Sequence, residues 1–446
     1  MARTFLNSRI ALAVALSSGL IFTAASPALA AKKEAKPAGP DFSDGFRKAA
    51  GPLQAAMDAG TKSVSGVPAG NEAARDAAYA SAKQAIDTAL GGNAKAAFDA
   101  AAPAATTPDD KNALGTLMRN YGIISKDLAF KQKGNLMQLE SGKAAPDQIG
   151  LMNFDAGVTA YQLADYPTAA KYLMAAKAAG YHDSNNQIDA IIADTYRKSG
   201  NTQGLLQMAQ ADIAAAKAKG TAPSEEALRN ALQQTYSAKQ VGPSTEYAAM
   251  LARYYPSAWN TSISVVRQMT SLPREQNLDL MRLMFLTGAM KDKNDYLEYI
   301  DNLDPRAYPG EALKVMDDGI AKGKLSNADL GADRSTASGR ISGDKASLPS
   351  TERDANKPGA TAASVMGAGD VFMSYEQPAK AEGFYAKALG LPGVDANKAA
   401  LRLGMAQVQQ GKYAEAQASF AKVSGTRAPV AQLWNAYAQS KASPAG

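Results

Sequence analysis

Three segments of this 446-residue chain share one spacing of small and large residues, and that spacing restricts the possible fold most strongly. Each segment has a glycine, an alanine twelve residues later, and a large apolar residue four residues after that. The three sets are Gly157, Ala169 and Leu173; Gly369, Ala381 and Tyr385; and Gly404, Ala416 and Phe420, with Leu403 before the last glycine. The spacing predicts pairs of helices that cross closely at the small residues, with the large residue filling the gap to the next unit.

A fourth unit is less regular, with Ala193 and Tyr196 before a Ser-Gly-Asn turn. Gly369 and Gly404 are 35 residues apart, and Gly157 and Ala193 are 36 apart. These units resemble the tetratricopeptide repeat (TPR), whose pattern is a Leu-Gly, a later small residue and then an aromatic residue. The resemblance implies a concave, right-handed superhelix that binds peptide segments or protein surfaces.

Composition also favours helices. Hydrophobic residues make up 46% of the chain and aromatic residues only 7%, while alanine is frequent, so closely packed helices are favoured over a sheet. No segment shows the sustained two-residue alternation of a strand. We therefore predict an all-α fold, an α-α superhelix built as a TPR-like helical-repeat solenoid.

The repeats lie on either side of a polar stretch. We predict a degenerate helical-repeat solenoid over residues 42–323, and a C-terminal pair of repeats with a capping helix over residues 361–441. Residues 324–360 are small and polar without a helical period, which predicts a long disordered linker. Because an array needs about three repeats for stability, the C-terminal pair is expected to dock on the earlier solenoid.

The N-terminal segment is typical of a targeting sequence. Arg3 and Arg9 precede an apolar run, and an Ala-x-Ala sequence ends at Ala30. We predict a signal peptide over residues 1–30, cleaved after Ala30, and export to a bacterial periplasm; retention as an uncleaved anchor is the alternative. Residues 31–41 are rich in lysine, proline and alanine, which predicts a flexible lead-in.

Several kinds of site are excluded or disfavoured. Without cysteine, the chain has neither disulfides nor thiolate metal sites. Its one histidine, His182, lies between two predicted helices with no recognisable nucleophile, so we interpret it as a loop residue. The formal net charge of +6 is small and dispersed, which argues against nucleic-acid binding. We predict no catalytic residue, no cofactor and no metal ion.

Two further patterns resemble functional motifs. Ser342 and Lys345 match the Ser-x-x-Lys sequence of penicillin-binding enzymes, but they lie in the predicted linker and the partner motifs of that family are missing from the sequence. Tyr161, Tyr166 and Tyr172 either line a concave binding surface or fill gaps between helices. The sequence leaves both interpretations of the tyrosines open.

The resulting hypothesis is a non-enzymatic scaffold of the bacterial cell envelope that binds other proteins or peptide segments. One alternative is a regulator of a peptidoglycan or envelope-assembly enzyme. Another is a lytic-transglycosylase-like enzyme, although no stretch has the pattern of a lysozyme-like domain. A carrier of a small apolar ligand is a further alternative. The sequence identifies neither the partner nor the face that binds it.

Overall fold

The computed structural model describes residues 39–65, 67, 71–182 and 187–442. The predicted signal peptide and most of the predicted lead-in lie outside these residues. In the described residues every regular element is a helix, and the chain divides into two compact units, the first ending at Asn201 and the second beginning at Thr202. The prediction of an all-α, helical-repeat fold is confirmed. No helix in the described ranges is both long and apolar enough to cross a bilayer.

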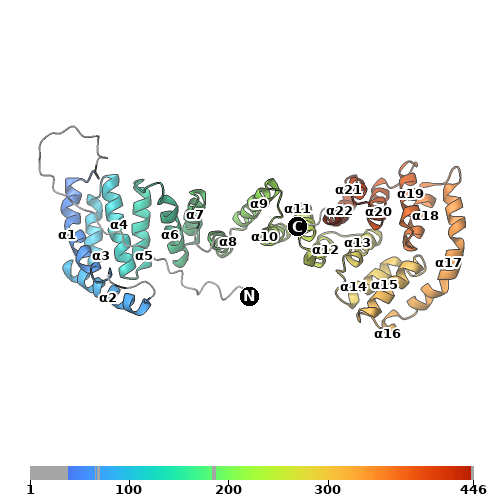
Figure 1. The fold of residues 1–446 in the computed structure, drawn as a ribbon, viewed down its shortest axis with the longest axis horizontal. Helices are drawn as coiled ribbons and strands as arrows, with labels where there is room; N and C mark the ends of the chain where they lie inside the picture. The colour runs from blue at the N-terminus through green and yellow to red at the C-terminus, as the bar shows by residue number, and fades with distance from the viewer. Residues whose placement is uncertain (1–38, 66, 68–70, 183–186, 443–446) are drawn as a thin grey trace. The chain divides into compact units, whose positions relative to one another are not determined.

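In the first unit most helices pack on their neighbours along the chain, and the first helix packs on the second, third and fourth (Figure 1, blue to green). Its helices are α1 (Asp44–Thr61), α2 (Glu72–Ala89), α3 (Ala94–Ala101), α4 (Pro108–Ile124), α5 (Leu128–Glu140), α6 (Ile149–Gln162), α7 (Tyr166–Ala178) and α8 (Ile188–Ser199). Local sequence sets where these helices begin. At α4, the Thr107 hydroxyl accepts from the Asp110 amide at 3.1 Å, and the Asp110 carboxylate accepts from the Thr107 amide at 3.0 Å.

Helices α4 and α5 cross so closely that their backbones touch. A Cβ atom on Gly134 would lie 2.3 Å from the backbone nitrogen of Arg119, and one on Gly122 would lie 2.4 Å from that of Lys131. Glycine is the only residue without a Cβ, so these positions allow the close approach. The crossing fixes how α4, α5 and the following α6 stack.

The second unit contains the remaining helices. They are α9 (Thr202–Ala218), α10 (Glu225–Ser237), α11 (Val241–Tyr254), α12 (Trp259–Met269), α13 (Arg274–Leu286), α14 (Lys293–Leu303), α15 (Pro309–Ala321), α16 (Asn327–Leu330), α17 (Asp333–Asn356), α18 (Ala362–Ser374), α19 (Pro378–Leu389), α20 (Ala396–Gln409), α21 (Tyr413–Phe420) and α22 (Ala428–Ala442). One hydrophobic core runs through it from Ala252 to Ala438. Residues 252–438 are therefore held by one core, with no break between the predicted solenoid and the C-terminal repeats.

Helices α11 to α22 form a closed ring, which we call the helical ring (Figure 1, yellow-green to red). Apart from the short α16, each helix packs on the next one in this order, and α22 packs back against α11, α12 and α13. The predicted last helix is present as α22, but it closes a ring instead of capping an open array. Trp434 of α22 is only 1% exposed, because α22 is covered by helices on both sides instead of ending an open array.

The prediction of a disordered linker over residues 324–360 is also wrong. Most of this stretch is the 24-residue helix α17, which packs against α15 and α18. Its buried surface is narrow, with Ala337 0% and Ala355 1% exposed. Polar contacts add to the packing: the Tyr375 hydroxyl donates to Asp344 at 2.9 Å, and Lys387 donates to the carbonyl of Ala355 at 2.7 Å. Because polar contacts hold this helix, its sequence lacks the periodic apolar residues by which a helix is predicted.

Candidate functional site

The repeat residues predicted from the sequence lie at helix crossings. A Cβ atom on Gly157 would lie 2.7 Å from Leu173, one on Gly369 2.5 Å from the Tyr385 ring, and one on Gly404 2.4 Å from the Phe420 ring. The large residue of each unit thus fills the space that its own glycine leaves open. The other predicted positions are buried, apart from the half-buried Tyr196; they are Ala169, Ala193, Ala381, Leu403 and Ala416. These residues pack helices against one another.

Inside the helical ring lies a buried network of charged side chains, which we call the charge network: Asp279, Arg282, Glu311, Asp370 and Arg402. Arg402 of α20 is 2% exposed and its guanidinium reaches three carboxylates. It lies 2.5 Å from Asp370 of α18, 3.3 Å from Asp279 of α13, and 3.1 Å from Glu275 at the start of α13. One arginine therefore joins three helices of the ring.

The other half of the charge network is a forked ion pair. Arg282 donates from two nitrogens to the two oxygens of Glu311, each at 2.8 Å, and a third nitrogen lies 3.1 Å from Asp279. The Tyr299 hydroxyl also donates to Glu311, at 2.7 Å. Burial alone would raise the pKa of Glu311, but the charge of Arg282 and these hydrogen bonds outweigh it and hold the pKa below its ordinary value of 4.5.

Asp279 connects this network to the last helix. The Trp434 indole nitrogen donates to the Asp279 backbone carbonyl at 2.9 Å, and Arg427 lies 3.7 Å from the second Asp279 carboxylate oxygen. Residues far apart in the sequence therefore meet at one side chain. None of the charged residues of this network was predicted from the sequence.

One sequence signal could have pointed to them. Arg402 stands two residues before Gly404, and Asp155 stands two residues before Gly157, each in a largely apolar helix. Both charged residues are 2% exposed. Asp155 accepts from Arg119 at 3.0 Å and from Lys131 at 2.6 Å, so it ties α6 to α4 and α5. A charge at this repeat position indicates a buried ion pair.

Next to the charge network the ring encloses a pocket of about 560 Å³, which we call the central pocket. Helices α13, α14, α15, α18, α20, α21 and α22 all contribute to it, and Arg282, Glu311 and Tyr299 belong to its lining. The remaining lining is mainly apolar or aromatic: Phe285, Leu286, Val315, Met373, Pro378, Val408, Tyr413, Trp434 and Tyr437. The exposed lining of the pocket is about equally polar and apolar, so the recess offers both kinds of contact.

The lining of the central pocket also carries polar groups that are not engaged. Among the described residues, the hydroxyls of Tyr413 and Tyr437 and the amide of Gln409 have no hydrogen-bond partner. Leu286 is 41% exposed at the pocket. The pocket therefore offers an apolar surface together with free donors and acceptors.

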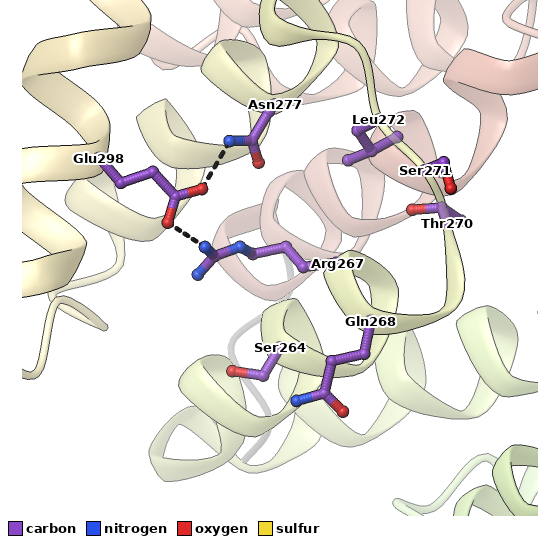
Figure 2. A pocket seen from close by; sticks show the side chains of 8 residues that line it. All are labelled: Ser264, Arg267, Gln268, Thr270, Ser271, Leu272, Asn277 and Glu298. Atoms are coloured by element: carbon purple, nitrogen blue, oxygen red, sulfur yellow. Dashed lines mark hydrogen bonds and ion pairs between the residues drawn. The ribbon is translucent and has the colours of Figure 1, made fainter.

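A second recess of about 510 Å³ lies between α12, α13 and α14, and it is polar (Figure 2). Arg267 of α12 forms an ion pair with Glu298 of α14, and Asn277 of α13 donates to the same carboxylate at 2.7 Å. These contacts link three neighbouring helices. We interpret this recess as a polar contact region between helices of the ring, with a structural role.

The remaining sequence candidates lie at separate places. His182 is exposed, and Ser342 and Lys345 are exposed on α17. Tyr161 donates to Asp194 and contacts the Tyr166 ring edge-on at 5.9 Å, which links α6 to α7 and α8. These two tyrosines therefore fill a gap between helices. In the described part of the chain, no group of three or more His, Asp or Glu side chains is arranged to hold a metal ion.

Comparisons with known proteins give little further information. No protein-family model matches the sequence, and no curated protein matches it. Among solved structures, the one described as "Structure of Naa15/Naa10 bound to HypK-THB" aligns over 86% of this chain and 70% of that chain, with 13% identity and a TM-score of 0.26. Likeness at this level supports no argument about function, which must come from the site itself.

The charge network predicts a specific dependence of stability on pH. The pKa of Glu311 and that of Glu275 are both lowered: burial would raise each one, but hydrogen bonds and the charges of Arg282, Lys398 and Arg402 outweigh it. A lowered pKa stabilises the fold above the unfolded pKa, here 4.5, and this contribution is lost as pH falls through the folded pKa. We expect the urea midpoint of the second unit to fall as pH decreases below about 4.5.

Tryptophan fluorescence measures this effect selectively, because both tryptophans, Trp259 and Trp434, lie in the second unit. The control is Glu311→Gln, which should be less stable at neutral pH but less sensitive to acid. An unchanged midpoint between about pH 6 and pH 3 would contradict the stabilising role of these carboxylates.

Proposed function

We propose that this protein is a non-enzymatic scaffold that binds a segment of another protein in the central pocket. The observation that carries the proposal is a recess that combines apolar surface with hydrogen-bonding groups on Tyr413, Tyr437 and Gln409 that have no partner among the described residues. Each residue of an extended peptide other than proline has one backbone N–H and one backbone carbonyl. These groups can form hydrogen bonds with the two tyrosines and the glutamine while the side chains of the peptide enter the recess.

The rigidity of the surrounding ring supports this function. The pocket is lined by residues from 282 to 437, and the charge network and the Trp434–Asp279 hydrogen bond hold these distant segments together. A preformed pocket binds with a smaller entropy cost than one that must be assembled by the ligand. Folding therefore prepares the site before a partner arrives.

We further propose that the protein is exported through its N-terminal signal sequence and acts in the bacterial cell envelope. The support is the sequence pattern of residues 1–30, with Arg3 and Arg9 before an apolar run and an Ala-x-Ala end. Its partner would then be another envelope protein, and regulation of a peptidoglycan or envelope-assembly enzyme is one form that this function takes. A lytic-transglycosylase-like enzyme would instead show muralytic activity in a zymogram.

Site-specific photocrosslinking in cells tests the proposed binding. A benzoylphenylalanine residue at position 286 would lie in the central pocket, and Leu286 is exposed enough to tolerate it. We expect one dominant crosslinked protein. The crosslink should weaken when Tyr413→Phe, Tyr437→Phe and Gln409→Ala remove the free polar groups without removing most of the packing.

The matched control is the same photoreactive residue at position 163. Leu163 is 39% exposed, close to the 41% of Leu286, but it belongs to the first unit and does not line the pocket. Crosslinking to the same protein at both positions, or to none at position 286, would refute binding in the central pocket.

A further inference from the structure

Helix α17 is the least buried of the long helices in the helical ring. Its two buried residues, Ala337 and Ala355, lie near its two ends. Between them no side chain is buried, and the two large apolar residues, Ile341 and Leu348, are only half-buried. Packing of an apolar face supplies most of the stability of a helix in a protein. The middle of α17, residues 338–354, therefore receives little stabilisation from packing.

The sequence of α17 also disfavours a helix. Ten of its 24 residues are glycine, proline, serine or threonine. Gly339 and Gly343 lose more conformational freedom in a helix than any other residue type would. Pro349 has no N–H to donate, and its ring crowds the carbonyl of Lys345. Helix α17 is thus held by its surroundings and not by its own helical preference.

One hydrogen bond connects the middle of α17 to the edge of the central pocket. Tyr375 directly follows α18, and its hydroxyl donates to Asp344 of α17 at 2.9 Å. Its ring lies against the start of α15, where a Cβ atom on Gly310 would be 2.8 Å away. Its neighbours in sequence, Ser374 and Glu376, both line the pocket. Tyr375 therefore stands at the pocket edge, in contact with α15 and α17.

Two other contacts of the middle segment are open to solvent. Glu352 pairs with Lys380 of α19 at 2.7 Å, but 38% and 46% of these side chains are exposed. The exposed Lys345 ammonium lies 6.0 Å from the centre of the Tyr375 ring. Exposed charge contacts of this kind stabilise a fold little, so they do not compensate for the missing packing.

We propose that α17 is a releasable strap. Residues 338–354 unfold locally and re-form while the rest of the helical ring stays folded, and each release frees the Tyr375 side chain at the pocket edge. The charge network stays in place during release, because none of its residues belongs to α17. This device goes beyond the proposed binding function and does not require it. For a partner bound in the pocket, it would change the shape of one edge of the site.

Hydrogen exchange measures the release. After correction for the intrinsic rate of each residue, the amides of residues 338–354 should exchange at least about a hundredfold faster than those of α18 and α20. Gly339→Ala and Gly343→Ala together should slow the exchange of this segment about tenfold, because alanine favours a helix. No heavy atom lies within 4 Å of either added Cβ, so the two substitutions introduce no clash.

Gly383→Ala is the matched control. Gly383 is also an exposed helical glycine with no heavy atom within 4 Å of an added Cβ, but it belongs to α19. It should leave the exchange of α17 unchanged. Exchange of residues 338–354 as slow as that of α18, or equal effects of the control and the alanine pair, would overturn the strap.

A fluorinated tyrosine at position 375 tests the link to the pocket. Relaxation dispersion of its fluorine signal should show exchange between a held and a released ring, and the alanine pair should weaken this exchange. Absence of dispersion, or dispersion that the alanine pair leaves unchanged, would refute the release of Tyr375 with α17. Neither readout involves a partner, so failure of the strap and failure of crosslinking at position 286 are separate results.

Discussion

Replacing Arg402 by methionine should lower the free energy of unfolding of the second unit by roughly 3–5 kcal/mol. Methionine fills part of the space, but Asp279 and Asp370 lose a cation while they remain 0% and 7% exposed. A buried carboxylate without its partner is far more costly than a buried pair. Urea unfolding followed by tryptophan fluorescence measures the loss, because both tryptophans lie in this unit.

Two controls separate loss of the network from loss of any ion pair. Lys357→Met breaks the ion pair with Asp354, in which both side chains are more than half exposed, so it should change stability by less than about 0.5 kcal/mol. In Arg402→Met, Asp279 keeps Arg282 as a partner, whereas Asp370 loses its cation. Combining Arg402→Met with Asp370→Asn removes that uncompensated charge and should recover part of the stability. If Arg402→Met alone lowers the free energy of unfolding by less than about 1 kcal/mol, the charge network does not stabilise the helical ring.

Gly134→Ala should destabilise the first unit by about 3 kcal/mol, although it adds a single methyl group. The new Cβ would lie 2.3 Å from the backbone nitrogen of Arg119 and 2.6 Å from the carbonyl oxygen of Gly115. Both atoms belong to the backbone of α4, so no side-chain rotation relieves the clash and the helices must separate. Urea unfolding followed by far-UV circular dichroism should show a transition at lower urea, with the tryptophan fluorescence transition unchanged.

Gly45→Ala is the matched control in the same unit. Gly45 is also helical, but no heavy atom lies within 4 Å of its added Cβ. Because alanine favours a helix more than glycine does, this substitution should leave stability unchanged or raise it by up to about 1 kcal/mol. Equal effects of the two substitutions would mean that the α4–α5 crossing is not as close as described.

Local features of the fold were predictable from the sequence. Gly157, Gly369 and Gly404 lie at helix crossings, where the spacing placed them, because a helix pair is encoded over a few turns of chain. The α4–α5 crossing was missed, although Gly115 and Gly122 are seven residues apart and therefore share one face of a helix. That signal was present in the sequence.

The ring and its pocket were not predictable in this way. Arg402 contacts Asp279 across 123 positions of sequence, and Trp434 contacts it across 155. The periodicity of a sequence does not predict such long-range contacts. Helix α17 was not predicted because it has no apolar face in the sequence. Two buried alanines and scattered polar contacts hold it against the rest of the second unit. Long-range polar contacts determine the candidate site, and a single sequence does not show them.

The closure of the helical ring can be measured directly by chemical crosslinking within one chain. Arg253 of α11 donates to Gln439 of α22 at 3.1 Å, across 186 positions of sequence. The natural chain has no cysteine, so Arg253→Cys and Gln439→Cys introduce its only two thiols. A short bismaleimide should join them within a single chain in dilute solution. Two thiols that each react with a monofunctional maleimide but give no intrachain crosslink would contradict the closed ring.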